Sequence, residues 1–221
     1  MATVQQLLSS FNTAAGGGGG SISTLETGFP TAGSTHNVSM PASVSVNDLL
    51  ICAFTHRGSG TATTPSGWTL LTYTNNGGGC KLGSYYKVAD GSEGGTTVNF
   101  ATTTNGQAEA IVYHVPAGTY TGTPEVSGTF ASSANPNPPL LTPSWGMDDV
   151  LWIAVFGCFD QITVSVYPLP DNNEAYSSSA VSSVSIGSCT TVLSASSEDP
   201  GTFTISASKS WLAHTIGLRY P

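Results

Sequence analysis

The chain has 221 residues and a formal net charge of −8, with 8% charged and 39% hydrophobic residues. A chain of this length and hydrophobic content can bury a core, which argues against intrinsic disorder. The five Lys and Arg residues are scattered, which argues against nucleic-acid binding, because that function needs a clustered basic surface. No apolar run is long enough to span a bilayer, so we expect no membrane association.

Residues 1–31 are predicted to form an extended N-terminal arm, with the five glycines at 16–20 acting as a hinge. Leu7, Leu8 and Phe11 precede this hinge and are candidate contacts with a partner; a frayed terminus is the alternative. The segment lacks the basic and long apolar regions of a secretory signal. We therefore expect the protein to be made in a cytoplasm and either to stay there or to leave it inside a larger assembly or by lysis.

From residue 35 onward, short apolar or β-branched runs alternate with turn residues, which predicts strands and not helices. The continuous apolar runs at 49–54 and 150–156 indicate strands that are buried on both faces. A connector rich in Gly, Thr, Ser and Pro is predicted at 116–138. The other predicted strands lie at 36–40, 44–46, 68–73, 81–88, 96–100, 108–115, 162–166, 181–186, 190–194, 203–206 and 211–219.

The two halves of the chain resemble each other, which predicts an approximate internal duplication. Asp48 and Asp149 each precede a buried apolar run, at an offset of 149 − 48 = 101 residues. Glu93 and Glu198 each lie in an acidic loop ahead of a strand, at an offset of 198 − 93 = 105 residues. The repeated parts are strands and turns, so the repeat concerns architecture.

The half repeats cover about 35–115 and 139–220, and either one alone would make a small sheet with exposed edges. We therefore predict one all-β domain over 32–221, an antiparallel, jelly-roll-like β-sandwich closed by the two halves together. Two independent small domains are the alternative.

Four cysteines are present, and none has the spacing of a zinc site or a C-x-x-C motif. Buried free thiols are the favoured interpretation for a protein assembled in a cytoplasm. One disulfide within each half is the alternative, because the spacings of 28 and 31 residues are similar in the two halves. The cysteines are Cys52, Cys80, Cys158 and Cys189.

No nucleophile–base, phosphate-binding or zinc-protease motif occurs, so we predict no enzymatic activity, no cofactor and no metal. Glu109 and Asp160 are the candidate carboxylate pair for a glycosidase, although a solvated strand residue is the ordinary interpretation of Glu109. The acidic loops at 90–95 and 198–201 contain oxygen ligands suited to Ca²⁺, but turns use the same residues, and we favour turns.

Three tyrosines are expected in loops, where an aromatic ring with a polar tip suits a contact surface. They are Tyr120, Tyr167 and Tyr176, and they are candidate partner contacts together with the three apolar residues of the arm. His114 and His214 are predicted on corresponding end strands of the two halves, where a packing role is favoured over ligation.

Several motifs together resemble a β-sandwich domain that is common in tailed-phage virion proteins and in some bacterial surface proteins. The resemblance covers about 35–221. The chain departs from the family pattern at Asn47, where glycine is usual, and at Gly94, where proline is common. The matching strings are Asp48-Leu49-Leu50, Pro65-Ser66-Gly67-Trp68-Thr69, Tyr85-Tyr86-Lys87-Val88-Ala89-Asp90-Gly91-Ser92-Glu93, Ala110-Ile111-Val112-Tyr113 and Ala213-His214-Thr215-Ile216-Gly217-Leu218-Arg219.

The resemblance implies a non-enzymatic structural protein of the virion, foremost a capsid decoration (cement) protein that stabilises subunit junctions. Its expected partners are other virion proteins, namely the major capsid protein or tail proteins, and a homo-oligomer is expected. A junction formed by residues 116–138 would support this interpretation. The alternative is a lectin-like host-recognition module of a tail or fibre, with a glycan bound by Tyr120, Asn135, Asn137, Asn172 and Asn173.

Overall fold

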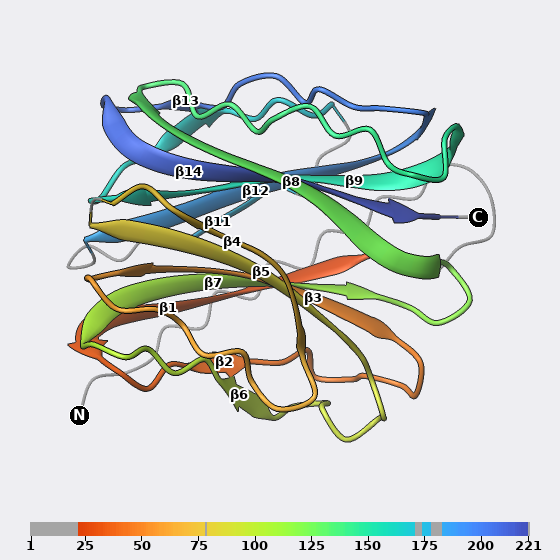
Figure 1. The fold of residues 1–221 in the computed structure, drawn as a ribbon. Helices are drawn as coiled ribbons and strands as arrows, with labels where there is room; N and C mark the ends of the chain where they lie inside the picture. Colours follow the sequence, from red (N-terminus) through yellow and green to blue (C-terminus); the bar gives the residue numbers. More distant parts are fainter. Residues whose placement is uncertain (1–21, 78, 171–173, 178–182, 221) are drawn as a thin grey trace.

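The computed structural model describes residues 22–77, 79–170, 174–177 and 183–220. Within these ranges the chain forms fourteen β-strands and no helix. Two five-stranded antiparallel sheets pack face to face, and each is covered on its outer side by a two-stranded layer (Figure 1). The predicted all-β, antiparallel β-sandwich is therefore confirmed.

The first sheet is made only of strands from the first half of the chain, in the order β1-β7-β3-β5-β4. Every neighbouring pair is antiparallel. Its strands are β1 (Ser23–Gly33), β3 (Leu49–Arg57), β4 (Thr69–Asn75), β5 (Cys80–Val88) and β7 (Gly106–Val115).

The second sheet is made only of strands from the second half, in the order β11-β12-β9-β14-β8. Its neighbouring pairs are also antiparallel. Its strands are β8 (Thr121–Ser133), β9 (Asp148–Phe159), β11 (Ala175–Ser177), β12 (Val184–Ala195) and β14 (Lys209–Arg219).

The outer layers are two small ladders, β2 (Asn37–Ser39) with β6 (Thr97–Asn99), and β10 (Val164–Val166) with β13 (Thr204–Ile205). They divide the interior into three apolar cores: one between the two sheets and one beneath each outer layer. This layering explains the continuous apolar runs of β3 and β9. Each of these two central strands faces one core with its odd-numbered residues and another with its even-numbered residues.

The two sheets have matching connectivity. Reading each half from its first strand, the order β1-β7-β3-β5-β4 corresponds position by position to β8-β14-β9-β12-β11. The outer ladders differ, because β2 precedes the central strand β3 whereas β10 follows the central strand β9. The sheets are stacked in opposite order, so that β1 lies against β11 and β4 lies against β8. An internal duplication requires two sheets with matching connectivity, and the duplication itself stays a prediction.

Two segments that were predicted to contain no strand of the sandwich do contain one. β1 starts at Ser23 and pairs with β7, so 23–31 belong to the first sheet and not to the arm predicted over 1–31. β8 occupies much of the predicted connector at 116–138 and pairs with β14. Both are edge strands that are mostly half-buried or exposed, so their Thr, Ser, Gly and Pro content resembles that of a loop.

Three smaller expectations are also corrected. The two strands predicted at 181–186 and 190–194 form the single strand β12, because Gly187 fits against the ring of Phe156 and does not end the strand. Residues 44–46 form no strand, since they lead into a turn. The short strand β11 was not predicted.

All four cysteines are buried free thiols. Cys52 lies in the core beneath the first outer layer and Cys80 lies in the core between the sheets, so they occupy opposite faces of the first sheet. On neighbouring strands, Cys158 pairs with Ser185 and Cys189 with Ala154, an offset of four residues, or roughly 13 Å along the strands. A disulfide needs Cα atoms within about 7 Å, so the alternative of one disulfide per half is wrong.

Candidate interaction surface

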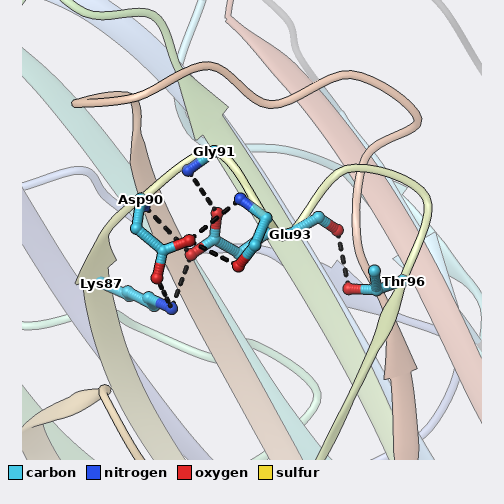
Figure 2. Close-up of polar contacts among 6 residues, drawn as sticks. Lys87, Asp90, Gly91, Glu93 and Thr96 are labelled. Atoms are coloured by element: carbon cyan, nitrogen blue, oxygen red, sulfur yellow. Dashed lines mark hydrogen bonds and ion pairs between the residues drawn. The ribbon is translucent and has the colours of Figure 1, made fainter.

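The acidic loop after β5 is closed by its own polar groups. Glu93 is 4% exposed on its side chain and forms an ion pair of 2.6 Å with Lys87. Its carboxylate also accepts hydrogen bonds from the backbone N–H of Asp90 at 3.2 Å and of Gly91 at 3.1 Å (Figure 2). Thr96 donates its hydroxyl to the Glu93 carbonyl at 2.7 Å. The oxygens that Ca²⁺ would need are engaged by N–H, ammonium and hydroxyl groups, so this loop is a turn.

The pKa of Glu93 reflects this arrangement. Burial by itself would raise the pKa of Glu93, but the hydrogen bonds from Lys87 and from the Asp90 amide outweigh burial and hold the pKa below its usual value. The second acidic loop lacks such an ion pair. There the backbone of Glu198 is bonded to Leu141, while burial, followed by the charge of Asp199, raises the pKa of the Glu198 carboxyl.

Asp48 joins the start of β3 to the segment that leads from the first sheet to the second. Its carboxylate accepts hydrogen bonds from His114 Nε2 at 2.6 Å, from the Ser45 amide at 2.7 Å and from the Ala117 amide at 2.8 Å. Burial would raise the pKa of Asp48, and these bonds, with that from His114 the largest, lower it. Asp48 is thus a structural turn residue, and His114 has a hydrogen-bonding role to Asp48 in place of the predicted packing role.

His214 links the two sheets. Its Nδ1 lies 2.8 Å from the Ser84 hydroxyl and its Nε2 lies 2.8 Å from the Thr74 hydroxyl, and the imidazole is fully buried. Burial lowers the pKa of His214 to about 3. A Ser–His contact resembles a nucleophile and its base, but this pair has no access to a substrate because it lies between packed sheets. His214 therefore has a buried, hydrogen-bonded structural role.

The two candidate glycosidase carboxylates make contacts with other residues. Glu109 on β7 is fully buried and its carboxylate lies against Gly28 of β1. Asp160 follows β9 and pairs with Lys209 at 2.7 Å. A carboxylate without exposed surface cannot contact a polysaccharide, so these two side chains do not form the pair that glycoside hydrolysis needs. The solvated face predicted for Glu109 is also wrong, because both faces of β7 are covered by cores.

The candidate contact residues differ in their placement. Leu7, Leu8 and Phe11 lie outside the described residues. Tyr120 is partly buried, packs against the core between the sheets, and donates its hydroxyl to the Asn47 carbonyl at 2.9 Å. Tyr167 is partly buried, with its ring centroid 5.9 Å from that of Phe203.

Tyr176 lies in β11, not in the predicted loop. Of the candidate glycan-binding amides, Asn135 and Asn137 are exposed and Asn172 and Asn173 lie outside the described residues. The Asn135 side chain donates to the Phe203 carbonyl at 3.4 Å.

The structure instead reveals exposed apolar side chains at one end of the sandwich, which sequence reasoning missed. We call this end, where β3 and β9 begin, the Asp48 end; it lies to the right in Figure 1. Exposure there ranges from 43% to 75%. The residues are Val46, Val88, Met147, Val192 and Leu193. Four further exposed apolar residues lie elsewhere: Leu70 on β4, Phe130 on β8, Leu140 in the segment before β9 and Val166 on β10.

No family model matches the chain, and no similar curated protein or solved structure was found. Among the residues described by the structure, no group of three or more His, Cys, Asp or Glu side chains is placed to hold a metal ion. No helix in the described part of the chain is long and apolar enough to cross a membrane.

Proposed function

We propose that the protein is a non-enzymatic structural component of a tailed-phage virion, foremost a capsid decoration protein that stabilises subunit junctions. The observation that carries this proposal is the Asp48 end, where apolar side chains from both sheets are exposed, two of them beside turns that are fixed by hydrogen bonds to Asp48 and Glu93. Exposed apolar side chains gathered at one end of a folded domain suit adhesion to another protein.

Both halves of the chain contribute to this surface. Val46 is 59% exposed beside the turn fixed by Asp48, and Val88 is 47% exposed at the end of β5. In the second half, Met147 is 75% exposed just before β9, and Leu193 is 45% exposed near the end of β12. A partner that covers this end would contact both sheets, and because binding favours the bound form of each protein, the assembly would gain stability.

The lectin-like alternative has less support in the described residues. Tyr120 would have to stack on a sugar, but its ring packs on the core and its hydroxyl is bonded to Asn47. A sugar site needs several convergent polar groups. Asn135 and Asn137 alone do not supply them.

The test is incorporation into particles of a phage that encodes this chain, measured by quantitative mass spectrometry of purified virions. On the order of hundreds of copies per particle is expected for a capsid component with symmetric sites. Leu193→Glu should abolish incorporation while leaving the thermal midpoint of the free protein unchanged. The matched control is Val166→Glu, which changes an equally exposed valine on β10 and should incorporate normally.

A few copies per particle would contradict the decoration role and favour the tail. Incorporation of Leu193→Glu at the level of the control would show that the Asp48 end is not the contact. Specific binding of the free protein to a host glycan, with incorporation unaffected by Leu193→Glu, would favour the lectin-like alternative.

A further inference from the structure

The sandwich has four sheet edges, formed by β1 and β4 in the first sheet and by β11 and β8 in the second. An edge strand presents unpaired N–H and C=O groups to any strand that approaches it. Natural proteins protect such edges with short strands, bulges, proline or charged residues. An edge without these features is therefore a candidate site for pairing with another strand.

Three of the four edges are protected. β1 contains Pro30, its register shifts between Phe29 and Gly33, and Thr27 on it accepts a hydrogen bond from the Ser39 amide of β2 at 3.2 Å. β4 has seven residues and a register shift after Leu70. β11 has only three residues. None of these three presents a long, regular row of backbone groups.

The edge of β8 is different. Residues 125–133 pair with β14 in unbroken register, from Glu125 opposite Gly217 to Ser133 opposite Lys209. Its irregular features, Pro124 and a register shift in β14, are confined to the start of the strand. From 126 to 133 the strand contains neither proline nor a charged residue, and no described strand pairs with its outer edge.

Phe130 marks this edge as incompletely covered. Its neighbour across the ladder is Leu212, which belongs to the core between the sheets, so Phe130 points to the inner side of the sheet. Val126 lies on the same face and packs against that core. Phe130 is nevertheless 54% exposed, because β8 is the last strand of its sheet. An inward-facing aromatic ring at an open edge would be covered if the sheet continued.

We propose that β8 pairs antiparallel with β8 of a second copy of this chain, so that the two second sheets join into one continuous sheet about a two-fold axis. A strand that pairs with its own copy is self-complementary, as a two-fold interface requires. A register centred on Thr129 places Phe130 opposite Gly128 of the second copy, so that the ring would lie beside Thr74 and His214, which fill the inner side of that glycine. The same register places Glu125 opposite Ser133, so like charges do not meet.

This dimer forms in the free protein and goes beyond the proposed function, because it involves β8 and not the Asp48 end. It is tested by light scattering coupled to size-exclusion chromatography on the full chain, at roughly 1 to 100 μM. The wild type should be dimeric at the upper concentrations. Phe130→Lys, which places a charge at the edge, should weaken the dimer by at least about tenfold.

Two further variants sharpen the test. Ser132→Lys changes a small exposed residue on the same strand and should also weaken the dimer, so it decides the outcome if Phe130→Lys lowers the thermal midpoint. Val166→Lys is the matched control, since Val166 is 49% exposed on β10, and it should leave the dimer intact.

Three outcomes would overturn the proposal. The first is a wild-type monomer at the highest concentration. The second is a dimer that survives both Phe130→Lys and Ser132→Lys. This outcome includes a dimer that is lost only when residues 1–21 are removed. The third is a dimer weakened equally by Val166→Lys. A failure here would leave the particle experiment unaffected, because that experiment measures incorporation through the Asp48 end.

Discussion

The hydroxyl of Ser84 on β5 lies 2.8 Å from Nδ1 of His214 on β14, and both residues are fully buried. This contact is a polar link between the two sheets beside a largely apolar core. A second link runs from the other ring nitrogen to Thr74 on β4, also at 2.8 Å. The imidazole is surrounded by neutral hydroxyls, so protonation would place an unpaired charge between the sheets.

We predict that acid weakens the protein through His214. The unfolded chain binds a proton with a pKa near 6.5, whereas burial lowers the folded pKa to about 3. The stabilisation is therefore fully present above pH 6.5 and is lost as the pH falls toward 3. His214→Asn should be less stable than wild type near neutral pH. It should, however, lose on the order of 2 kcal/mol less between about pH 7.5 and about pH 5.

Denaturant unfolding of the two proteins at both pH values measures this difference. The pKa of His56 is also lowered by burial, to about 4, but His56 is present in both proteins and cancels in the comparison. Equal losses in wild type and His214→Asn would contradict the prediction.

A second prediction concerns the ion pair in the loop after β5. Glu93→Gln should lower the free energy of unfolding by about 2 kcal/mol at neutral pH, because the largely buried ammonium of Lys87 loses its closest partner. Because the pKa of Glu93 is lowered, its stabilisation is present above the usual pKa of 4.5 and is lost below it. The difference between the proteins should therefore shrink in acid.

The matched control for this loop is Asp90→Asn. The side chain of Asp90 is 63% exposed and lies 3.3 Å from the same ammonium. Its substitution should leave the unfolding midpoint unchanged. If both variants were equally destabilised, the buried position of Glu93 would not be the cause.

A third prediction concerns Asn47, in the turn before β3. Asn47 has a φ of 68°, in the left-handed region that asparagine tolerates better than other side chains and glycine tolerates best. Asn47→Val should lower the free energy of unfolding by about 2 kcal/mol, and Asn47→Gly should change it by less than about 1 kcal/mol. The bond from Tyr120 is to the backbone carbonyl and is kept in both variants.

Thermal and denaturant unfolding of the Asn47 variants provides the check. Asn137→Val is the control, because Asn137 is an exposed asparagine with no positive φ. A loss of stability in Asn137→Val as large as that in Asn47→Val would point to the loss of the amide in general and not to the turn.

A fourth prediction is that the thiols are unreactive in the folded protein. Burial raises the pKa of Cys80 to about 11 and that of Cys189 to about 12, and it also raises the pKa of Cys52 and Cys158. Because the thiolate is the reactive form, a thiol reagent such as Ellman's reagent should label none of them within minutes at neutral pH. In denaturant all four should react, without prior reduction. Fewer than four reactive thiols would indicate a disulfide.

The central strands could be predicted from the sequence because their burial on two faces produces a continuous apolar run. The edge strands could not. β1 and β8 are stabilised by pairing with β7 and β14, which lie far away in the chain, while their own residues are polar or small. Gly187 similarly resembles a turn in the sequence, although it is needed in the middle of β12 for close packing against Phe156.

The same distinction applies to the polar contacts. Lys87 and Glu93 are six residues apart, so their loop could be recognised as a closed turn. Asp48 and His114 are separated by 66 residues, and Ser84 and His214 by 130, so these contacts depend on strand register and sheet stacking. The exposed apolar residues of the Asp48 end could not be predicted either, because the sequence does not show which loops lie at the same end.

The chain passes from the first sheet to the second only once, between β7 and β8. During synthesis, the first sheet can therefore be completed as soon as β7 has left the ribosome. Its inner face is then completely covered only when the end of β14 has been made, which is 219 − 115 = 104 residues later. At roughly 5–20 residues per second this takes about 5–20 s. During that interval the apolar inner face of a finished sheet is open to the same face of a neighbouring nascent chain on the same message.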